Sequence, residues 1–462
     1  IVWFGTQEAQ GTLVTYPLSS GTGGTGGTGG NAKGAITLAG FSSFYSDNGG
    51  PYQVDIEVRV DNDTLNFIPA RQVVTVSQYG AKTNIGIVGG TQGYEEWSGD
   101  DSITLIGDIT IPAGTTLTIN EGAIINIDPI DQLSGGIDKD HIEIIVEGEL
   151  VFQLANSGNS PSSNTLVGAN TSSPGDWYGI RIEDGGSLTM NGVELANAEV
   201  GVTIHSGRQR GTILNSVIKK TRQYGLNGCP DSFSNNQFLD CGIQGEKAAI
   251  RIDGCFKNYN YGPATLTKNY AGVQTGSNSG SPISLNDWEI DQSVTYGIEH
   301  TGALEQLNIF GGSITNSETA VYLTSPTATT KLEGVQIRSN SLNGVHVWRG
   351  AVELLSSELR GNKQGIVFES SADGSNSSLR WTNIHDNNKF DVENHTSHQI
   401  EAKENYWGNY KDDDSAASEM EGGAQNISKI YDRFDDGSKG EVVYPGYFLQ
   451  PCVIQTNADS CY

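Results

Sequence analysis

Pairs of a small and an aliphatic residue return along the chain at a nearly constant spacing. From residue 179 onwards a glycine, an alanine or once an aspartate precedes an aliphatic residue, and the spacing is 21 to 26 residues. Repeats of this length indicate a solenoid in which each unit buries its apolar face against its neighbours. Between the pairs no apolar side chains recur at helical spacing, so the repeating unit is predicted to consist of strands. The ten pairs are Gly179-Ile180, Gly201-Val202, Gly225-Leu226, Ala249-Ile250, Gly272-Val273, Gly297-Ile298, Ala320-Val321, Gly344-Val345, Gly365-Ile366 and Asp391-Val392.

The pattern divides the chain into four segments. Residues 1–33 combine one or two short strands with a Gly/Thr-rich tether. In residues 34–99 apolar and polar residues alternate, which predicts the strands of a small β domain. Residues 100–410 are predicted to form a parallel β-helix of about twelve rungs, and residues 411–462 an irregular C-terminal cap. Within the coils asparagine recurs, as at Asn215, where its tolerance of a left-handed backbone suits a turn.

Composition and charge narrow the class of protein. Glycine accounts for 60 of 462 residues, and the charged fraction is only 18%, which fits a turn-rich β protein with a neutral polar surface. The formal net charge of −27 disfavours nucleic acid, anionic membranes and polyanionic substrates. It fits a soluble extracellular protein or one that takes up divalent cations. The sequence contains no apolar run long enough for a membrane span.

The cysteines and the first residue both favour an exported protein. The chain begins at Ile1 rather than at methionine, which we interpret as a mature form whose export signal has been removed. Cys452 and Cys461 are expected to form a disulfide in an oxidising compartment. Three further cysteines lie near successive turns, so two of them could bridge adjacent rungs and leave one buried thiol; they are Cys229, Cys241 and Cys255. No CxxC motif accompanies them, which disfavours a zinc site.

Two stretches carry a resemblance to a known family. GDITIPAGTTLTINEGA at 107–123, EGELVF at 147–152 and SPGDWYGIRI at 173–182 resemble the opening of secreted bacterial β-helix proteins of the pectate-lyase-like superfamily. NYWGN at 405–409 and IYDRFDDGSKGEVVYPGYFLQP at 430–451 resemble the segment that closes such helices on surface-exposed bacterial proteins. The resemblance covers about residues 100–451 and implies a right-handed parallel β-helix. It implies no particular activity, because the superfamily contains lyases, hydrolases, epimerases and adhesins.

The sequence shows no clear set of catalytic residues for either a polysaccharide lyase or a hydrolase, two classes of enzyme that share this fold. A polysaccharide lyase needs acidic calcium ligands beside an Arg or Lys that removes a proton. The basic residues on the predicted rungs lie outside any stacked set of aspartates; they are Lys219, Lys220, Arg222, Arg251, Arg338, Arg349 and Arg360. A hydrolase needs paired carboxylates, and the Asp-Asp pairs at 100–101, 412–414 and 435–436 fall outside the uninterrupted coils. We therefore predict no catalytic residues.

Acidic residues near the C-terminus are candidate calcium ligands. Asp412, Asp413, Asp414, Asp435 and Asp436 could bind Ca²⁺ through carboxylate oxygens, although their spacing differs from an EF-hand loop. A solvated acidic cap is the alternative.

Three further groups of residues are weaker candidates. Asp128, Asp131, Asp138 and Asp140 form a second acidic set, and His395 and His398 could meet a metal or serve as polar turn residues. Tryptophans that could stack on sugars are interpreted mostly as packing residues; they are Trp177, Trp288, Trp348, Trp381 and Trp407. Five sequons permit N-glycosylation, at Asn62, Asn170, Asn376, Asn394 and Asn426.

Two functional hypotheses follow from these patterns. The favoured one is a non-catalytic extracellular structural or adhesive protein, as a filament or surface-layer subunit that adds its N-terminal strand to a neighbour's sheet edge. Self-association or other surface proteins would then be its partners. The alternative is a carbohydrate-active enzyme, lyase or hydrolase, or a carbohydrate-binding protein, and it rests on the fold alone.

Overall fold

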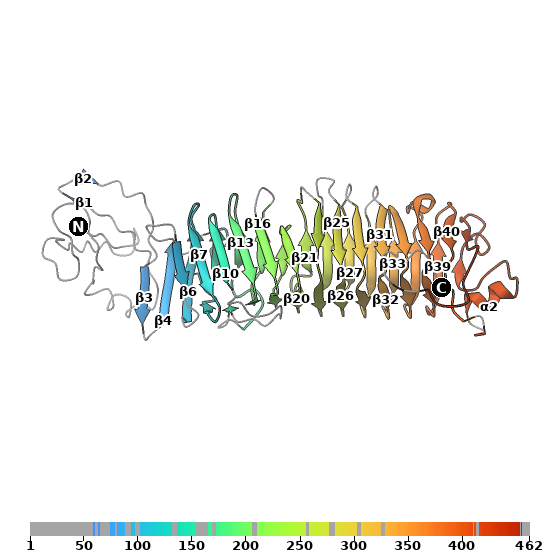
Figure 1. The fold of residues 1–462 in the computed structure, drawn as a ribbon, viewed down its shortest axis with the longest axis horizontal. Coiled ribbons are helices and arrows are strands. Elements are labelled where there is room, and N and C mark those ends of the chain that lie inside the picture. The colour runs from blue at the N-terminus through green and yellow to red at the C-terminus, as the bar shows by residue number, and fades with distance from the viewer. Residues whose placement is uncertain are drawn as a thin grey trace.

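Stacked short strands dominate the described part of the chain. The computed structural model describes residues 59–60, 63–64, 74–78, 81–87, 94–97, 102–452 and 454, with gaps inside the long range at 132–135, 154–164, 169–171, 206–209, 256–257, 277–281, 303–305, 325–328, 410 and 413–414. The strands form an all-β parallel solenoid of about 11 turns, with 3% of the described residues helical (Figure 1). The predicted fold class is confirmed.

Equivalent strands of successive turns pair in parallel and in register, which produces three ladders that we name A, B and C. Ladder A contains β9 (Glu143–Val146), β12 (Gly179–Ile182), β15 (Val202–Ile204), β18 (Leu226–Asn227), β21 (Ala248–Ile252), β24 (Ala271–Thr275), β27 (Tyr296–His300), β30 (Thr319–Leu323), β33 (Asn343–Val347), β36 (Gln364–Phe368), β39 (Phe390–Asn394) and β41 (Ile430–Tyr431).

Ladder B has two parts. Its first part contains β5 (Tyr94–Trp97), β7 (Thr116–Asn120), β10 (Glu149–Gln153), β13 (Ser187–Asn191), β16 (Arg210–Leu214) and β19 (Ser232–Ser234). Its second part contains β22 (Tyr259–Tyr261), β25 (Ile283–Asn286), β28 (Leu307–Phe310), β31 (Thr329–Glu333), β34 (Ala351–Leu355), β37 (Ser378–Arg380), β40 (Ile400–Lys403) and β42 (Val442–Val443).

Ladder C contains β8 (Ile124–Ile127), β11 (Thr165–Val167), β14 (Val193–Ala196), β17 (Val217–Lys219), β20 (Asn236–Leu239), β23 (Ala264–Thr267), β26 (Trp288–Asp291), β29 (Ser313–Thr315), β32 (Gln336–Arg338), β35 (Glu358–Arg360) and β38 (Asn383–His385). Ladders A and C meet at the long strand β6 (Ser102–Ile111), which pairs with both β8 and β9. Along the chain each turn passes from ladder B through ladder C to ladder A.

The solenoid begins before residue 100. β3 (Val74–Gln78) and β4 (Ala81–Ile87) form an antiparallel hairpin, but β4 also pairs in parallel with β6, and β5 pairs in parallel with β7. Part of the predicted separate domain at 34–99 therefore belongs to the stack. β1 (Arg59–Val60) and β2 (Asp63–Thr64) pair only with each other among the described strands.

The C-terminal segment continues the stack and then closes it. β41 and β42 add to ladders A and B. The helix α2 (Ala416–Glu421), capped by Ser415, buries Ala416, Ala417 and Met420 against the core. A 3₁₀ turn, η1 (Gly374–Asn376), lies between β36 and β37. No helix in the described part of the chain has the length and hydrophobicity needed to cross a membrane.

The repeated sequence pairs lie where ladder A faces the interior. Ile180, Val273 and Val345 are almost completely buried, each directly after its small residue. A small residue is required there because the next turn lies very close: a Cβ atom on Gly272 would approach the Gly297 carbonyl oxygen to 2.3 Å. The glycines of the repeated pairs thus record one contact that recurs in most turns.

Asparagines form a buried ladder at the corner between ladders C and A. The Asn362 Oδ1 atom accepts the backbone N–H of Asn340 at 3.0 Å, and the Asn387 Oδ1 atom accepts that of Asn362 at 3.0 Å. The residue before each is in the left-handed region, with φ of 67° at Gly361. At the other corner Asn215, with φ of 50°, donates to Asn191 of the preceding turn. The expected roles of asparagine in turns and between coils are confirmed there.

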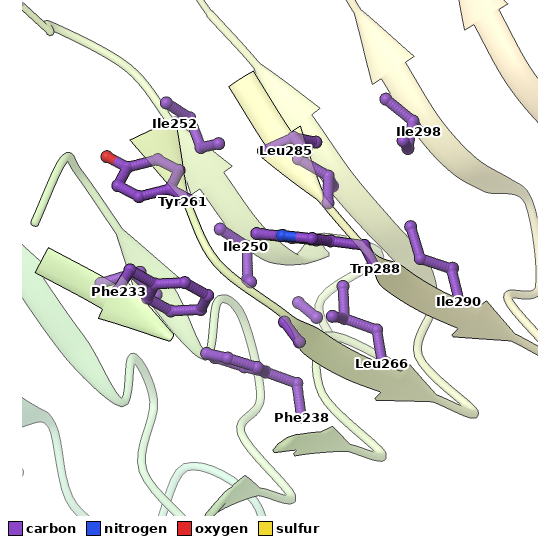
Figure 2. Close-up of a cluster of buried hydrophobic side chains, with 14 of the residues drawn as sticks. Phe233, Phe238, Ile250, Ile252, Tyr261, Leu266, Leu285, Trp288, Ile290 and Ile298 are labelled. Atoms are coloured by element: carbon purple, nitrogen blue, oxygen red, sulfur yellow. The ribbon is translucent and has the colours of Figure 1, made fainter. Parts of the chain in front are cut away.

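Aromatic side chains fill the interior where the two parts of ladder B meet (Figure 2). The Phe233 ring lies 5.5 Å from Trp288 and 5.5 Å from Tyr261, measured between ring centroids. The Trp288 indole N–H donates to the Gly262 carbonyl oxygen at 2.8 Å, which satisfies its polar group within the core. Trp177 and Trp407 are also fully buried.

A disulfide joins two adjacent turns in this region. Cys229 follows β18 and Cys255 follows β21, and their Cα atoms are 5.7 Å apart across the bond. Cys241 is a buried free thiol whose pKa burial raises to about 11. This is the arrangement expected of the three cysteines. Cys452 is buried and disulfide-bonded, whereas Cys461 lies outside the described residues, so that pairing stays a prediction.

Candidate functional site

One outward side chain per strand forms a continuous row along ladder A. In β21, β24, β30 and β33 the fourth residue is partly exposed while the other four are buried. Register pairing aligns these positions across consecutive turns. The row runs through Arg251, Gln274, Glu299, Tyr322 and His346. Neighbouring strands are about 4.8 Å apart, so these side chains form a contiguous surface.

Aromatic rings stack at the centre of this surface. The Tyr296 and Tyr322 rings are 4.7 Å apart with an interplanar angle of 15°, and the Tyr322 and His346 rings are 5.1 Å apart. The His346 ring in turn lies 6.3 Å from Trp348, edge to face. Trp348 directly follows β33 and is 44% exposed. We call Tyr296, Tyr322, His346 and Trp348 the aromatic row.

Carboxylates flank the aromatic row. Glu299 is the register partner of Tyr322 and accepts a hydrogen bond from the Gln274 side chain at 2.8 Å. Glu369 lies 3.2 Å from the His346 Nε2 atom. The pKa of the Tyr322 hydroxyl is raised by partial burial and then by the charges of Glu299 and Glu369. The phenol therefore remains a neutral hydrogen-bonding group near neutral pH.

A second charged group is buried near the start of ladder A. Glu143 is fully buried, and its Oε1 atom accepts the backbone N–H groups of Ile137 and Asp138 at 2.9 and 2.7 Å. Its Oε2 atom accepts from the Arg181 guanidinium at 2.9 Å. Residues 136–141 therefore fold over this carboxylate, and they do so with Ile137 turned towards solvent.

Asp108 completes that buried group. Its Oδ1 atom accepts the Glu143 backbone N–H at 2.8 Å, while its Oδ2 atom is buried without a hydrogen-bond partner among the described residues. Burial, together with the charges of Asp131 and Glu143, raises the pKa of Asp108 to about 7. A carboxyl pair that is closed off by residues 136–141 has no access for a substrate, so we assign this group to the stability of the fold.

The basic residues considered for lyase chemistry are mostly committed to ion pairs. Five of the seven contact a carboxylate of their own or an adjacent turn. The pairs are Lys219–Glu194, Arg222–Glu199, Arg251–Asp253, Arg338–Glu358 and Arg360–Asp386. Arg349 is exposed beside Trp348, and Lys220 is a left-handed turn residue.

The predicted calcium ligands serve turns where they are described. Asp435 accepts the backbone N–H of Asp432 at 3.2 Å, and Asp436 accepts that of Ser438 at 2.9 Å. Asp412 is exposed, and Asp413 and Asp414 lie outside the described residues. No group of three potential metal ligands occurs in the described part of the chain. Calcium binding stays a prediction.

The second acidic set and the histidine pair are also engaged locally. Asp128 accepts the backbone N–H of Ile130, and Asp138 accepts those of Asp140 and His141. Asp131 is buried and Asp140 is exposed. His395 contacts Glu393 at 2.9 Å, whereas the main chain of His398 bonds to the Thr396 hydroxyl and the Asn394 amide.

The asparagines of the N-glycosylation sequons differ in their exposure to solvent. Asn376 and Asn426 are exposed. Asn394 is fully buried, and its amide donates to the carbonyl oxygens of His398 and Gly440. A glycan on that nitrogen is incompatible with this packing, so the prediction for Asn394 is wrong for the folded chain. Asn62 and Asn170 lie outside the described residues.

Sequence reasoning missed most of the aromatic row. Of its four residues, only Trp348 is among the tryptophans that the sequence offers for stacking on sugars. A signal was available, because Tyr322 and His346 each follow the aliphatic residue of a repeated pair directly, at Val321 and Val345. Equivalent places in successive turns must be neighbours in a solenoid. Comparison of the sequence with protein-family models and with curated proteins finds no match.

Proposed function

We propose that this protein is a non-catalytic extracellular adhesive protein that binds carbohydrate along ladder A. The observation that carries the proposal is the aromatic row, in which rings from three consecutive turns form one partly exposed surface. Aromatic faces pack against the C–H-rich faces of sugar rings, and the adjoining amide and carboxylate groups offer hydrogen bonds to hydroxyls. The regular rise of the solenoid suits an extended polymer.

The absence of catalysis is part of the proposal. An inverting or retaining hydrolase places two carboxyl groups on either side of the bond it cleaves, whereas the contacts that Glu299 and Glu369 make are with Gln274 and His346. An extracellular location is supported by the disulfide between Cys229 and Cys255, because such bonds persist in oxidising compartments. The resemblance to secreted bacterial surface proteins agrees with it.

The filament hypothesis has less support from the described residues. Its joining segment, residues 1–33, lies outside them, so deletion of residues 1–30 remains its test. At the opposite end the edge strands β41 and β42 have two residues each, and α2 packs its apolar side against the core. Short and covered edges oppose the addition of a further strand. We therefore place binding, rather than polymerisation, first.

Affinity electrophoresis through gels that contain soluble polysaccharides tests the proposal. We expect at least one neutral or cationic polymer to retard the protein, and Tyr322→Ala and Trp348→Ala each to weaken binding about threefold to tenfold, because a ring stack contributes about 0.5–1.5 kcal/mol. Phe434→Ala is the matched control, since Phe434 is an aromatic residue with 39% exposure outside the aromatic row. Equal weakening by all three variants, or release of new reducing ends from the polymer, would contradict it.

A further inference from the structure

We propose that the aromatic row prefers glycans that carry protonated amines over neutral, N-acetylated or acidic glycans. This inference rests on the proposed carbohydrate binding and adds a chemical class of ligand. It follows from charge complementarity, because the rings lie among carboxylates that are not neutralised by Lys or Arg within the described residues.

Three carboxylates surround the row. Glu299 adjoins Tyr322 in register, and Glu369 adjoins His346 at 3.2 Å. Glu318 is exposed directly before β30, and its charge helps to raise the pKa of Tyr296, after the effects of burial, Tyr322 and Glu299. Each carboxylate can accept several hydrogen bonds, so Glu299 and Glu369 retain acceptor capacity beyond their contacts with Gln274 and His346.

Several acids on the other faces have basic partners. On ladder C, Glu194 pairs with Lys219 and Glu358 pairs with Arg338, in each case between adjacent turns. On ladder B, Lys331 pairs with Glu333 at 2.9 Å. Along the aromatic row the corresponding partners are the neutral amide of Gln274 and the imidazole of His346. Negative charge is therefore left available beside the rings.

An ammonium group would interact favourably with both the carboxylates and the aromatic rings of this surface. It can donate to a carboxylate, and it is attracted to the face of a tyrosine or tryptophan ring. A uronate would meet repulsion from the same carboxylates, and an N-acetyl group would leave them unpaired. Within the register row Arg251 is held by Asp253 at 2.6 Å, and Arg349 is exposed next to Trp348.

The test compares four hexasaccharides by titration calorimetry with the full chain: β-1,4-linked glucosamine at a pH at which its amines are protonated, its N-acetylated form, cellohexaose and an oligogalacturonate. We expect the glucosamine hexamer to bind about twofold to twenty-fivefold more tightly than the others, since two exposed ion pairs contribute about 1.4-fold to fivefold each. High salt should remove most of this difference.

Two variants test which carboxylates are responsible for the preference for protonated amines. Glu299→Gln and Glu369→Gln should each lower affinity for the glucosamine hexamer severalfold and leave affinity for the N-acetylated hexamer unchanged. Glu289→Gln is the matched control, because Glu289 is an exposed glutamate on ladder C.

The outcomes separate the two proposals. Equal binding of the N-acetylated and amine forms would overturn the preference and leave carbohydrate binding intact. An equal effect of Glu289→Gln would assign the preference to net charge and overturn the role of this surface. No binding of any hexamer would overturn both proposals.

Discussion

Asp391 occupies a position that glycine or alanine fills in the other turns, and this makes its ionisation a sensitive probe of the fold. The residue is 1% exposed, and its Oδ1 atom accepts the Asn387 side-chain amide at 2.8 Å at the end of the asparagine ladder. Burial raises its pKa from 3.8 to about 7, although Asn387 and the charge of Lys429 oppose the rise. The protonated carboxyl is therefore the form that the native core accommodates.

The magnitude follows from proton linkage. Between 3.8 and about 7 the folded chain retains a proton on Asp391 that the unfolded chain has released. In that window the unfolding free energy falls by about 1.4 kcal/mol per pH unit from this residue, or about 4 kcal/mol in total. The stabilisation is fully present below the unfolded pKa and is lost as the pH rises through the folded value. Asp108 contributes in the same direction, since its pKa is also raised to about 7.

Asp391→Asn isolates the contribution of Asp391, because asparagine keeps the Oδ1 acceptor and cannot ionise. We expect the variant to gain stability relative to the wild type as the pH rises from about 4 to about 7, by up to about 4 kcal/mol. Urea unfolding at a series of pH values measures this difference, and equal m-values would show that both proteins expose the same surface. Glu289→Gln, an exposed acid, should produce no such trend. A difference between wild type and Asp391→Asn that is independent of pH would refute the reasoning.

Three further changes test how adjacent turns are held together. Cys229→Ser should lower the unfolding free energy by about 2–4 kcal/mol and reduce the response of the melting temperature to reductant, because the disulfide of Cys452 is still present. Gly272→Ala should destabilise by about 1–3 kcal/mol, because the new Cβ meets a backbone oxygen, whereas Gly437→Ala has open space and should be neutral in the same thermal melt. Asn362→Ala leaves the buried N–H of Asn340 without its acceptor, so chemical denaturation should show a loss of about 1–3 kcal/mol; an unchanged midpoint would contradict the structural role of the asparagine ladder.

The repeat was predictable because one physical constraint recurs in every turn. A small residue before an aliphatic one is required wherever ladder A approaches the next turn, as at Gly272 and Val273. Such a constraint leaves a period in the sequence even when other positions vary. The count of about twelve rungs is close to the observed 11 turns for the same reason. The disulfide was partly predictable too, since Cys229 and Cys255 are separated by 26 residues, about one turn.

The point at which the solenoid begins was not predictable from the alternation of apolar and polar residues. The segments 74–78 and 81–87 alternate in a way that suits an antiparallel hairpin, and they do form one. The same strand at 81–87 also pairs in parallel with β6. Period-two alternation reports a strand with two different faces and contains no information about its partner, so a solenoid's first coil and a separate β domain have the same pattern.

The contacts among the buried charged residues near the start of the solenoid were also not predictable from the sequence. Asp108, Glu143 and Arg181 meet in space, although they are 35 and 38 residues apart in sequence. These separations exceed the common spacing of 21 to 26 residues, so the sequence period does not reveal the contact. The aromatic row has no such obstacle, since Tyr322 and His346 lie one regular turn apart, and a search for equivalent outward positions would have found it.

The surroundings of Glu299 favour a ligand-binding role for ladder A. Acids on the other ladders often pair with a basic residue on the same or an adjacent turn, as Glu194 does with Lys219, although Glu289 on ladder C is exposed between Thr265 and Ser313 in its register row. Glu299 lies between a glutamine and a tyrosine in its register row, and that tyrosine stacks on Tyr296. What distinguishes ladder A is therefore the combination of stacked rings with an adjoining acid that has no Lys or Arg partner among the described residues, and the proposed ligand with protonated amines would complement both.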